Sequence, residues 1–324
     1  MSVELEHTGL RVTEAEAAEL YRRMAVIRRF EQAAYRAYEQ GEVHGTVHVS
    51  IGQEAVAVGV MDALRPGDTV LSHHRGHGHA LAKGVDPGRL MAELCGRAGG
   101  VSRGKGGSMH ATDLDAGFLG TLAVVGAAIP LGVGYALAQR LKGTGAVCVV
   151  FFGDGAVNQG VLYESLNLAA LWSLPVLFVC ENNAYAITTA AHESTAGDGI
   201  AARARAFGVD GQEVDGQDVL AVRRLAASMA EAARNGRPGL MECLTYRFMG
   251  HSRGDPPHGI YRTKAELEAW TDRDPLALLA TAAGLTSEDT GRFQDEARRI
   301  ADDAMSFALA SPVPDESSLL EDVV

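Results

Sequence analysis

The amino-acid sequence predicts an α/β fold: a mostly parallel sheet with helices on both faces. Four short runs rich in β-branched and apolar residues alternate with segments of helical periodicity, and this alternation is typical of such a sheet. The first three runs end in the polar clusters "HHRGHGH", "GDG" and "NNAY", and the last continues into "RFMGHSRGDP". Because ligands bind beyond the carboxyl ends of parallel strands, we expect the functional site at that edge.

The predicted elements follow one another along the whole chain. The first helix covers residues 13–41, with apolar side chains recurring on one face and a glycine at its end. The other predicted helices span 53–63, 87–96, 126–142, 158–173 and 217–235. The predicted strands span 68–72, 145–152, 174–181 and 239–247. From about 264 to 309 the pattern is helical, and the acidic end "EDVV" is interpreted as a short tail. With no repeat or linker, we interpret residues 1–324 as one domain.

The composition narrows the class of protein. The chain has 29 basic and 41 acidic residues and a net charge of −12, which argues against nucleic acid as the main partner. No apolar run is long enough for a membrane span, and the first residues lack the layout of a signal peptide, so we expect a cytoplasmic protein. The cysteines are isolated and are interpreted as reduced core residues: Cys95, Cys148, Cys180 and Cys243.

The glycine-rich stretch "GGVSRGKGG" at 99–107 offers a hypothesis of a different class, a nucleotide-binding protein. Gly99, Gly104 and Lys105 match the start of a P-loop, but Gly106 stands where a serine or threonine should hold magnesium. The preceding residues have the pattern of a helix end rather than of a strand. We therefore favour an ordered glycine loop that passes close to the site or to a partner chain.

The histidines of "SHHRGHGH" raise the question of zinc. His73, His74, His77 and His79 follow a predicted strand, but no neighbouring acid or thiol completes a tetrahedral site, so zinc is not favoured. Arg75 is the more informative residue, because a guanidinium at a strand end suits a diphosphate.

The pairing of "GDG" with "ENNAY" is the strongest signal for function. One crossover helix separates the two motifs, so a βαβ unit brings Asp154 and Asn183 to neighbouring loops. A carboxylate, an amide oxygen and a nearby backbone carbonyl form half of an oxygen shell for Mg²⁺, which phosphates and water usually complete. The helix that opens near Asn158 adds its positive end to a phosphate.

The same region, "GDGAVNQGVLYESLNLAALWSLPVLFVCENNAY", resembles the thiamine-diphosphate motif. In detail the chain resembles the alpha subunits of the two-chain dehydrogenases that feed lipoyl complexes, such as pyruvate, branched-chain 2-oxo acid and acetoin dehydrogenases. The resemblance extends along most of the chain, through "IGQEAVAVG", "GKGGSMH", "VVGAAIPLGVGYAL" and "GHSRGDP…YRTKAELEAW". It implies the thiamine-diphosphate-binding fold, with thiamine diphosphate and Mg²⁺ as cofactors.

The resemblance also assigns cofactor-binding residues. It implies that Mg²⁺ is bound by the side chains of Asp154 and Asn183 and by the carbonyl of Tyr185. The residues implied in binding the diphosphate are Gly153, Gly155, Ala156, Arg75 and His74, the last of which stands where many pyruvate-type relatives have tyrosine. Those implied in holding the aminopyrimidine are Ala123, where the family often has glycine, and Val125.

For catalysis the resemblance singles out His251, which the family places beside the thiazolium and the diphosphate. An imidazole titrates near neutral pH, which suits proton transfer or reductive acylation. His48 is a second catalytic candidate. Ser252 matches a serine that is phosphorylated in some eukaryotic relatives, and Arg253 is expected to order its loop or to hold phosphate.

The partners follow from what the chain lacks. The glutamate that sets the pyrimidine tautomer comes from a separate beta subunit in the family, and Glu54 is interpreted as structural. The resemblance therefore implies a heterotetramer (α2β2) with the active site at its interface, and a lipoyl-bearing acyltransferase as acceptor. Acetoin is slightly favoured over pyruvate by "HHRGHGH", and branched-chain 2-oxo acids are the alternative. A cofactor-free scaffold is the remaining hypothesis.

Overall fold

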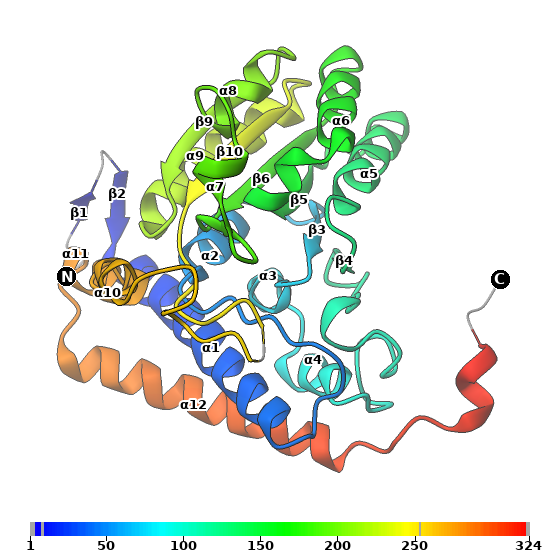
Figure 1. Ribbon diagram of the computed structural model, residues 1–324, viewed down its shortest axis with the longest axis vertical. Coiled ribbons are helices and arrows are strands. Elements are labelled where there is room, and N and C mark those ends of the chain that lie inside the picture. Colours follow the sequence, from blue (N-terminus) through cyan, green and yellow to red (C-terminus); the bar gives the residue numbers. More distant parts are fainter. Residues whose placement is uncertain (1–3, 8–9, 253, 322–324) are drawn as a thin grey trace.

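Six parallel strands form the central sheet of the computed structural model, which describes residues 4–7, 10–252 and 254–321 (Figure 1). Their order is β4-β3-β5-β6-β10-β9, and every neighbouring pair runs parallel. The strands are β3 (Thr69–His73), β4 (Phe118–Leu122), β5 (Cys148–Gly153), β6 (Val176–Asn182), β9 (Asp210–Asp215) and β10 (Gly239–Leu244). The predicted parallel sheet is confirmed.

The sequence predicted β3, β5, β6 and β10 but missed the two edge strands. β4 has the sequence FLGTL and contains a glycine, while β9 has the sequence DGQEVD and is mostly polar. An edge strand has only one neighbour and need not be buried on both faces, so it lacks the continuous apolar run that marks a central strand.

Helices cover both faces of the sheet, as predicted. On β5, Val149 and Phe151 belong to one core cluster, while Val150 and Phe152 belong to the other, because successive side chains of a strand point to opposite faces. The first cluster also contains side chains of α1 (Glu14–Glu39), α2 (Glu54–Asp62), α4 (Pro87–Leu94) and α9 (Val219–Arg234). The second contains side chains of α5 (Ala128–Lys142), α6 (Gly160–Leu171) and α8 (Ile200–Arg205).

The long first helix begins where the sequence predicted. The Thr13 hydroxyl accepts a hydrogen bond from the Glu16 backbone N–H (3.2 Å), and the Glu16 carboxylate accepts one from the Thr13 N–H (2.9 Å). This reciprocal capping satisfies two backbone donors that a helix start otherwise leaves unpaired. In Figure 1, α1 lies beside α12 (Ser287–Ala310), which brings the N-terminal and C-terminal parts of the chain together.

The remaining elements are a helical C-terminal part and several short helices, strands and turns. The predicted helix at 158–173 is α6, and a 3₁₀ turn at Asp154–Asn158 precedes it. The histidine stretch continues into a short helix, α3 (His77–Lys83). The helical C-terminal pattern corresponds to α10 (Lys264–Thr271), α11 (Pro275–Ala282) and α12. The others are β1 (Glu4–His7), β2 (Leu10–Thr13), β7 (Tyr185–Ala186), β8 (Thr189–Ala190), α7 (Ala191–Ser194) and 3₁₀ turns at Gly107–Met109 and Glu316–Leu320. Arg253 and most of the predicted acidic tail lie outside the described residues.

All four cysteines are buried and free, as predicted. Cys148 lies in β5 and Cys180 in β6, and both side chains are inaccessible to solvent. Burial raises the pKa of the Cys148 thiol to about 12, so the protonated form dominates at neutral pH.

The glycine-rich loop is organised by one buried carboxylate, that of Glu93 in α4. Glu93 Oε2 accepts hydrogen bonds from the backbone N–H groups of Ser102 (2.7 Å) and Gly104 (2.9 Å). Its Oε1 accepts from Gly106 (2.7 Å) and Gly107 (3.1 Å). The P-loop hypothesis is therefore wrong: the loop follows a helix, and these amides are bonded to an internal carboxylate rather than free for a phosphate.

We predict that Glu93→Ala lowers the free energy of unfolding by about 3–5 kcal/mol, because it removes a charged acceptor shared by four backbone donors. Denaturant unfolding measures this change, and limited proteolysis should show new cleavage within 99–110. Glu39→Ala is the control, because Glu39 is an exposed residue at the end of α1. Equal stability of the two variants would contradict the role given to Glu93.

Candidate functional site

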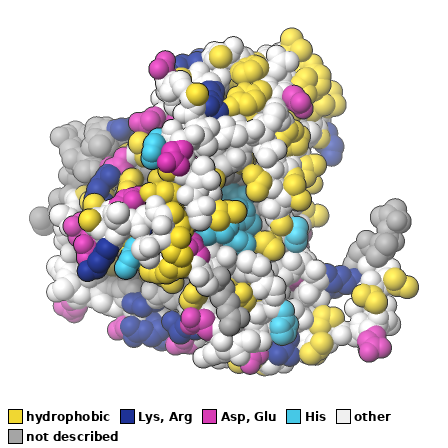
Figure 2. Space-filling view, viewed as in Figure 1, with side chains coloured by type: hydrophobic (Ala, Val, Ile, Leu, Met, Phe, Trp, Pro, Cys, Tyr) yellow, Lys and Arg dark blue, Asp and Glu magenta, His cyan; other side chains and the backbone are white. Residues whose placement is uncertain are grey.

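A pocket lies at the carboxyl ends of β3, β5 and β6, at the edge of the sheet where the sequence predicted the site. Figure 2 shows histidine side chains gathered in the hollow at the centre of one face of the molecule. The residues that line it are His73, His74, Arg75, Leu122, Val124, Val125, Gly126, Ala128, Phe151, Phe152, Gly153, Asp154, Gly155, Ala156, Asn183, Tyr185, Ala186, Ile187 and His251.

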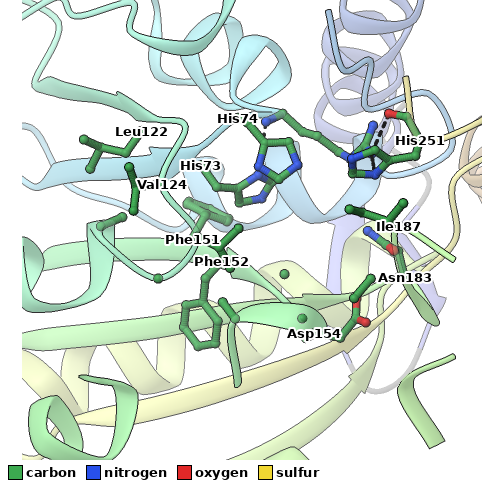
Figure 3. Close-up of a pocket in the computed structure, with 18 of the residues that line it drawn as sticks. His73, His74, Leu122, Val124, Phe151, Phe152, Asp154, Asn183, Ile187 and His251 are labelled. Carbon is green, nitrogen blue, oxygen red and sulfur yellow. Dashed lines mark hydrogen bonds between the residues drawn. The ribbon is translucent and has the colours of Figure 1, made fainter. Parts of the chain in front are cut away.

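Asp154 and Asn183 meet because β5 and β6 are neighbours in the sheet. Gly153, the last residue of β5, pairs with Glu181, the residue before the end of β6, so the two strands end side by side. Figure 3 shows the Asp154 and Asn183 side chains on the same side of the pocket, opposite His73 and His74. The predicted acid–amide pair is thus brought together.

Each of these two side chains keeps one oxygen without a partner in the described part of the chain: Asp154 Oδ2 and Asn183 Oδ1. Asp154 is 2% exposed and Asn183 is 6% exposed, so water does not readily compensate these atoms. Two buried, unsatisfied oxygens that face the same pocket fit a hard cation such as Mg²⁺, which prefers oxygen ligands.

Burial raises the pKa of Asp154 to about 6. Backbone hydrogen bonds and the positive charges of Arg247 and Arg75 lower it, but they only partly offset the loss of water. The ionised carboxylate is therefore destabilised in the protein without ligand, as expected for a group that is completed by a cation.

The turn after Asn183 places the third predicted oxygen. Ala184 has φ +70, a left-handed conformation that is uncommon for a residue other than glycine. The Ala184 N–H donates to Asn182 Oδ1 (3.2 Å), and its carbonyl accepts from the Ala191 N–H (2.8 Å). The next carbonyl, that of Tyr185, accepts a long hydrogen bond from Arg247 Nη2 (3.4 Å), which leaves a lone pair for another partner.

The opposite side of the pocket is built around Arg75, which is 2% exposed. Its Nη1 donates to the Val49 carbonyl (2.9 Å), and its Nη2 donates to Nδ1 (2.9 Å) and the carbonyl (2.8 Å) of His251. These acceptors are all neutral, and burial together with Arg247 lowers the pKa of Arg75 to about 9. A buried guanidinium bonded to neutral acceptors fits an anionic ligand such as a diphosphate.

Arg75 also determines the tautomer and the charge of the His251 imidazole. Because Nδ1 accepts from the guanidinium, the neutral ring carries its proton on Nε2. Burial and the charges of Arg75 and Arg247 lower the pKa of His251 to about 4. At neutral pH His251 is thus an uncharged imidazole with an N–H to donate.

His48 and His74 complete an imidazole cluster with His251. The ring centroid of His48 lies 4.6 Å from that of His74 and 4.9 Å from that of His251. Burial, and then Arg75, lower the pKa of His48 to about 3, and burial and His73 also lower the pKa of His74. His48 does not line the pocket and contacts two residues that do, His74 and His251.

His73 has a structural partner that the sequence analysis missed. Glu181 lies between two histidines, with its Oε2 2.7 Å from His73 Nε2 and its Oε1 3.3 Å from His79 Nε2. The expectation that no acid lies nearby was wrong, because this one comes from β6, far along the sequence. Zinc is still not supported: the Arg75 N–H donates to His73 Nδ1 (3.1 Å), so the neutral ring has its proton on Nε2.

Some of the other predicted residues line the pocket and others do not. Gly155 lies in the pocket wall, and a Cβ there would approach the Ala186 Cβ to 2.7 Å. Gly153, Ala156 and Val125 also line the pocket, whereas Ala123 does not, although its neighbours do. Glu54 is buried and forms an ion pair with Arg28, which supports its structural interpretation.

The sequence analysis missed the apolar part of the wall. Leu122, Phe151, Phe152 and Ile187 line the pocket and were not singled out. Phe151 and Phe152 precede "GDG" directly, so the end of a predicted strand was the available signal. Ile187 has φ +56 in an exposed turn, and nothing in its local pattern distinguishes it.

A parallel α/β sheet whose strand ends set two unsatisfied buried oxygens opposite a buried arginine has the arrangement that is typical of the ligand site of an α/β enzyme. A comparison with known families identifies the kind of enzyme. The chain belongs to the family described as the dehydrogenase E1 component, whose model matches residues 22–317.

Characterised relatives cover nearly the whole chain. The alpha subunit of acetoin:2,6-dichlorophenolindophenol oxidoreductase from Bacillus subtilis is 45% identical over 98% of this chain and 96% of its own length. The alpha subunit of the pyruvate dehydrogenase E1 component from Rhizobium meliloti is 44% identical over 94% of this chain and 88% of its own. The acetoin enzyme subunit from Cupriavidus necator is also 44% identical, over 94% and 92%.

We predict that Asp154→Asn stabilises the cofactor-free protein by about 1–3 kcal/mol, because it removes a buried charge that lacks a cation. Thermal unfolding at neutral pH measures the change. Asp198→Asn, at an exposed position, should leave the midpoint unchanged. A lower midpoint for Asp154→Asn would mean that the carboxylate is stabilised by the protein alone.

Proposed function

We propose that this chain is the alpha subunit of a thiamine-diphosphate-dependent dehydrogenase that acts on acetoin or pyruvate together with a beta subunit. Membership of the E1 family gives the reaction class. One observation supports placing the chemistry in this pocket: two unsatisfied buried oxygens, on Asp154 and Asn183, face a buried guanidinium, that of Arg75, across one cavity.

In this proposal Mg²⁺ is held by Asp154 Oδ2, Asn183 Oδ1 and the Tyr185 carbonyl. Arg75 pairs with the diphosphate, while His74, Gly153, Gly155 and Ala156 line its position. Ala123 and Val125 hold the aminopyrimidine, Ala123 through its main chain. When bound, thiamine diphosphate supplies an electron sink for cleaving a carbon–carbon bond next to a carbonyl.

His251 is the catalytic residue of this proposal, and His48 supports it. Arg75 occupies Nδ1 of His251, so the ring presents an Nε2–H that can donate to a substrate or acyl oxygen. His48 packs against His251 and orients the ring. His73 has both nitrogens engaged, by Arg75 N–H and Glu181, and so acts as a wall of the pocket rather than as an acid or base.

Exposed apolar residues at the opening of the pocket favour a partner protein that covers it. Val124 is 70% exposed, Val125 is 51% exposed and Ile187 is 58% exposed, although all three line the pocket. The apolar surface continues along α5 through Leu131 and Tyr135. We propose that the beta subunit covers this surface in a heterotetramer and supplies the missing glutamate, and that the acyl acceptor is a lipoyl-bearing acyltransferase.

The structure carries no helix, within its described ranges, that is long and apolar enough to cross a bilayer. The cytoplasmic location remains a prediction from the sequence. So does the absence of a nucleic-acid partner.

The choice of substrate is not decided by similarity, because an acetoin enzyme and a pyruvate enzyme are 45% and 44% identical to this chain. His73 and His74, from the stretch that favoured acetoin, both line the pocket. Their position is the reason to keep acetoin as the first substrate to test.

The proposed function is tested by dye reduction with the chain assembled with its beta subunit, thiamine diphosphate and Mg²⁺. We expect activity with acetoin or pyruvate, and the better of the two identifies the substrate class. Activity with branched-chain 2-oxo acids alone would select the alternative. In the matched Asp154→Ala complex, calorimetry should show no Mg²⁺-dependent cofactor binding; unchanged affinity would remove Asp154 from the site.

We predict that His251→Ala retains thiamine diphosphate but slows acyl transfer to the lipoyl group by about 10²–10³-fold, because it removes a positioned hydrogen-bond donor. Calorimetry measures the binding and a lipoyl-acylation assay measures the transfer. His44→Ala, at an exposed position, is the control. Normal transfer in His251→Ala would exclude His251 from the mechanism.

A further inference from the structure

Gln53 is a buried residue next to the proposed cation site, and it has no part in the proposed binding of the cofactor. It lies at the N-terminal end of α2 and is 1% exposed. Its Oε1 accepts a hydrogen bond from Asn183 Nδ2 at 2.9 Å. Gln53 does not line the pocket, so its effect on the site passes through Asn183.

This hydrogen bond is formed with the oxygen end of the Asn183 amide turned toward the cation site. With Nδ2 turned to Gln53, Oδ1 has no partner in the described part of the chain, like Asp154 Oδ2. The opposite rotation would present an N–H to the cation site. A cation binds the oxygen and is repelled by the N–H, so only the observed rotation is competent.

The backbone around Gln53 is held in place from several sides. The Gln53 N–H donates to the Ser50 carbonyl (2.9 Å), and the Phe248 N–H donates to the Ile51 carbonyl (3.0 Å). Gly52 has φ +102, and a Cβ there would come within 2.5 Å of the Tyr246 carbonyl. The amide of Gln53 is therefore presented from a fixed point.

The fixed backbone at Gln53 does not by itself determine how the side-chain amides of Gln53 and Asn183 are rotated. Gln53 Nε2 also has no partner in the described part of the chain. If both amides turned over, Gln53 Nε2 would donate to Asn183 Oδ1, and the pair would still form one hydrogen bond. The bound cation distinguishes the two arrangements, because it stabilises only the one in which Gln53 accepts and Asn183 donates.

We propose that Gln53 is a positioning residue that holds Asn183 with its oxygen toward the divalent cation. The proposal rests on the proposed function and deepens it. Partners of this kind, which bond to a metal ligand without touching the metal, typically contribute about 10–100-fold to metal affinity.

The test is a titration of Mn²⁺ into the assembled alpha–beta complex with saturating thiamine diphosphate, followed by the electron paramagnetic resonance signal of free Mn²⁺. Gln53→Met keeps the length of the side chain but offers only a weak sulfur acceptor in place of the amide oxygen, and should weaken Mn²⁺ binding about 10–100-fold. Gln53→Glu can accept from Asn183 Nδ2 and, when ionised, cannot donate. It should bind Mn²⁺ at least as tightly as the wild type.

Gln217→Met is the matched control. Gln217 is also fully buried, and its amide bonds to Thr245 Oγ1 (2.8 Å) and to the Arg273 carbonyl (3.1 Å), outside the pocket. It should lose stability as Gln53→Met does while keeping the Mn²⁺ affinity of the wild type. Equal weakening in both methionine variants would show a general effect of lost packing and overturn the proposal.

A double-mutant cycle isolates the orientation effect. Asn183→Asp presents an oxygen in either rotation, so adding Gln53→Met to it should change Mn²⁺ affinity by less than about threefold. If Gln53→Met weakens binding equally in the wild type and in the Asn183→Asp variant, or if folded Gln53→Glu binds weakly, the proposal is wrong. Wild-type complex that binds neither Mn²⁺ nor cofactor would instead refute the proposed function.

Discussion

The parallel pairing of β5 with β6 is the constraint on which the rest of the site depends. It sets Gly153 opposite Glu181, and the chain leaves both strands at the same edge. Asp154 and Asn183 consequently face one pocket, and Glu181 reaches back to hold His73 and His79. The same pairing divides the side chains of β5 between two cores, so the register fixes the packing and the chemistry together.

The two sides of the pocket differ in charge, and each lacks a bonded partner of the opposite charge among the described residues. On one side lie carboxylate and amide oxygens without partners in the described part of the chain, and on the other a guanidinium bonded only to an imidazole and to backbone carbonyls. Each side is costly in the protein alone, because burial removes water without supplying a counter-charge. A metal–diphosphate pair bound across the pocket would satisfy both sides at once, so ligand binding should add to stability as well as create the active site.

The sequence was sufficient for the central strands, the long helices and most of the polar residues that line the pocket, because each carries a local signal. Continuous apolar runs marked β5 and β6, and the motifs around Asp154 and Asn183 marked their ends. Contacts between distant segments had no such signal. Glu181 meets His73 only through the sheet, Gln53 meets Asn183 only through tertiary packing, and the edge strand β9 has a polar sequence. For these, the fold supplies the proximity that spacing along the chain does not.

The four hydrogen bonds between the glycine-rich loop and Glu93 affect how this part of the protein unfolds locally. The loop is also tied to the C-terminal segment, through the Ala98 N–H and the Pro312 carbonyl (2.9 Å) and through an Arg103–Glu321 ion pair. Because one carboxylate holds several amides, losing it releases them together rather than one by one. The loop and the C-terminal segment should therefore open as one cooperative unit, with amide hydrogens that exchange at a common rate.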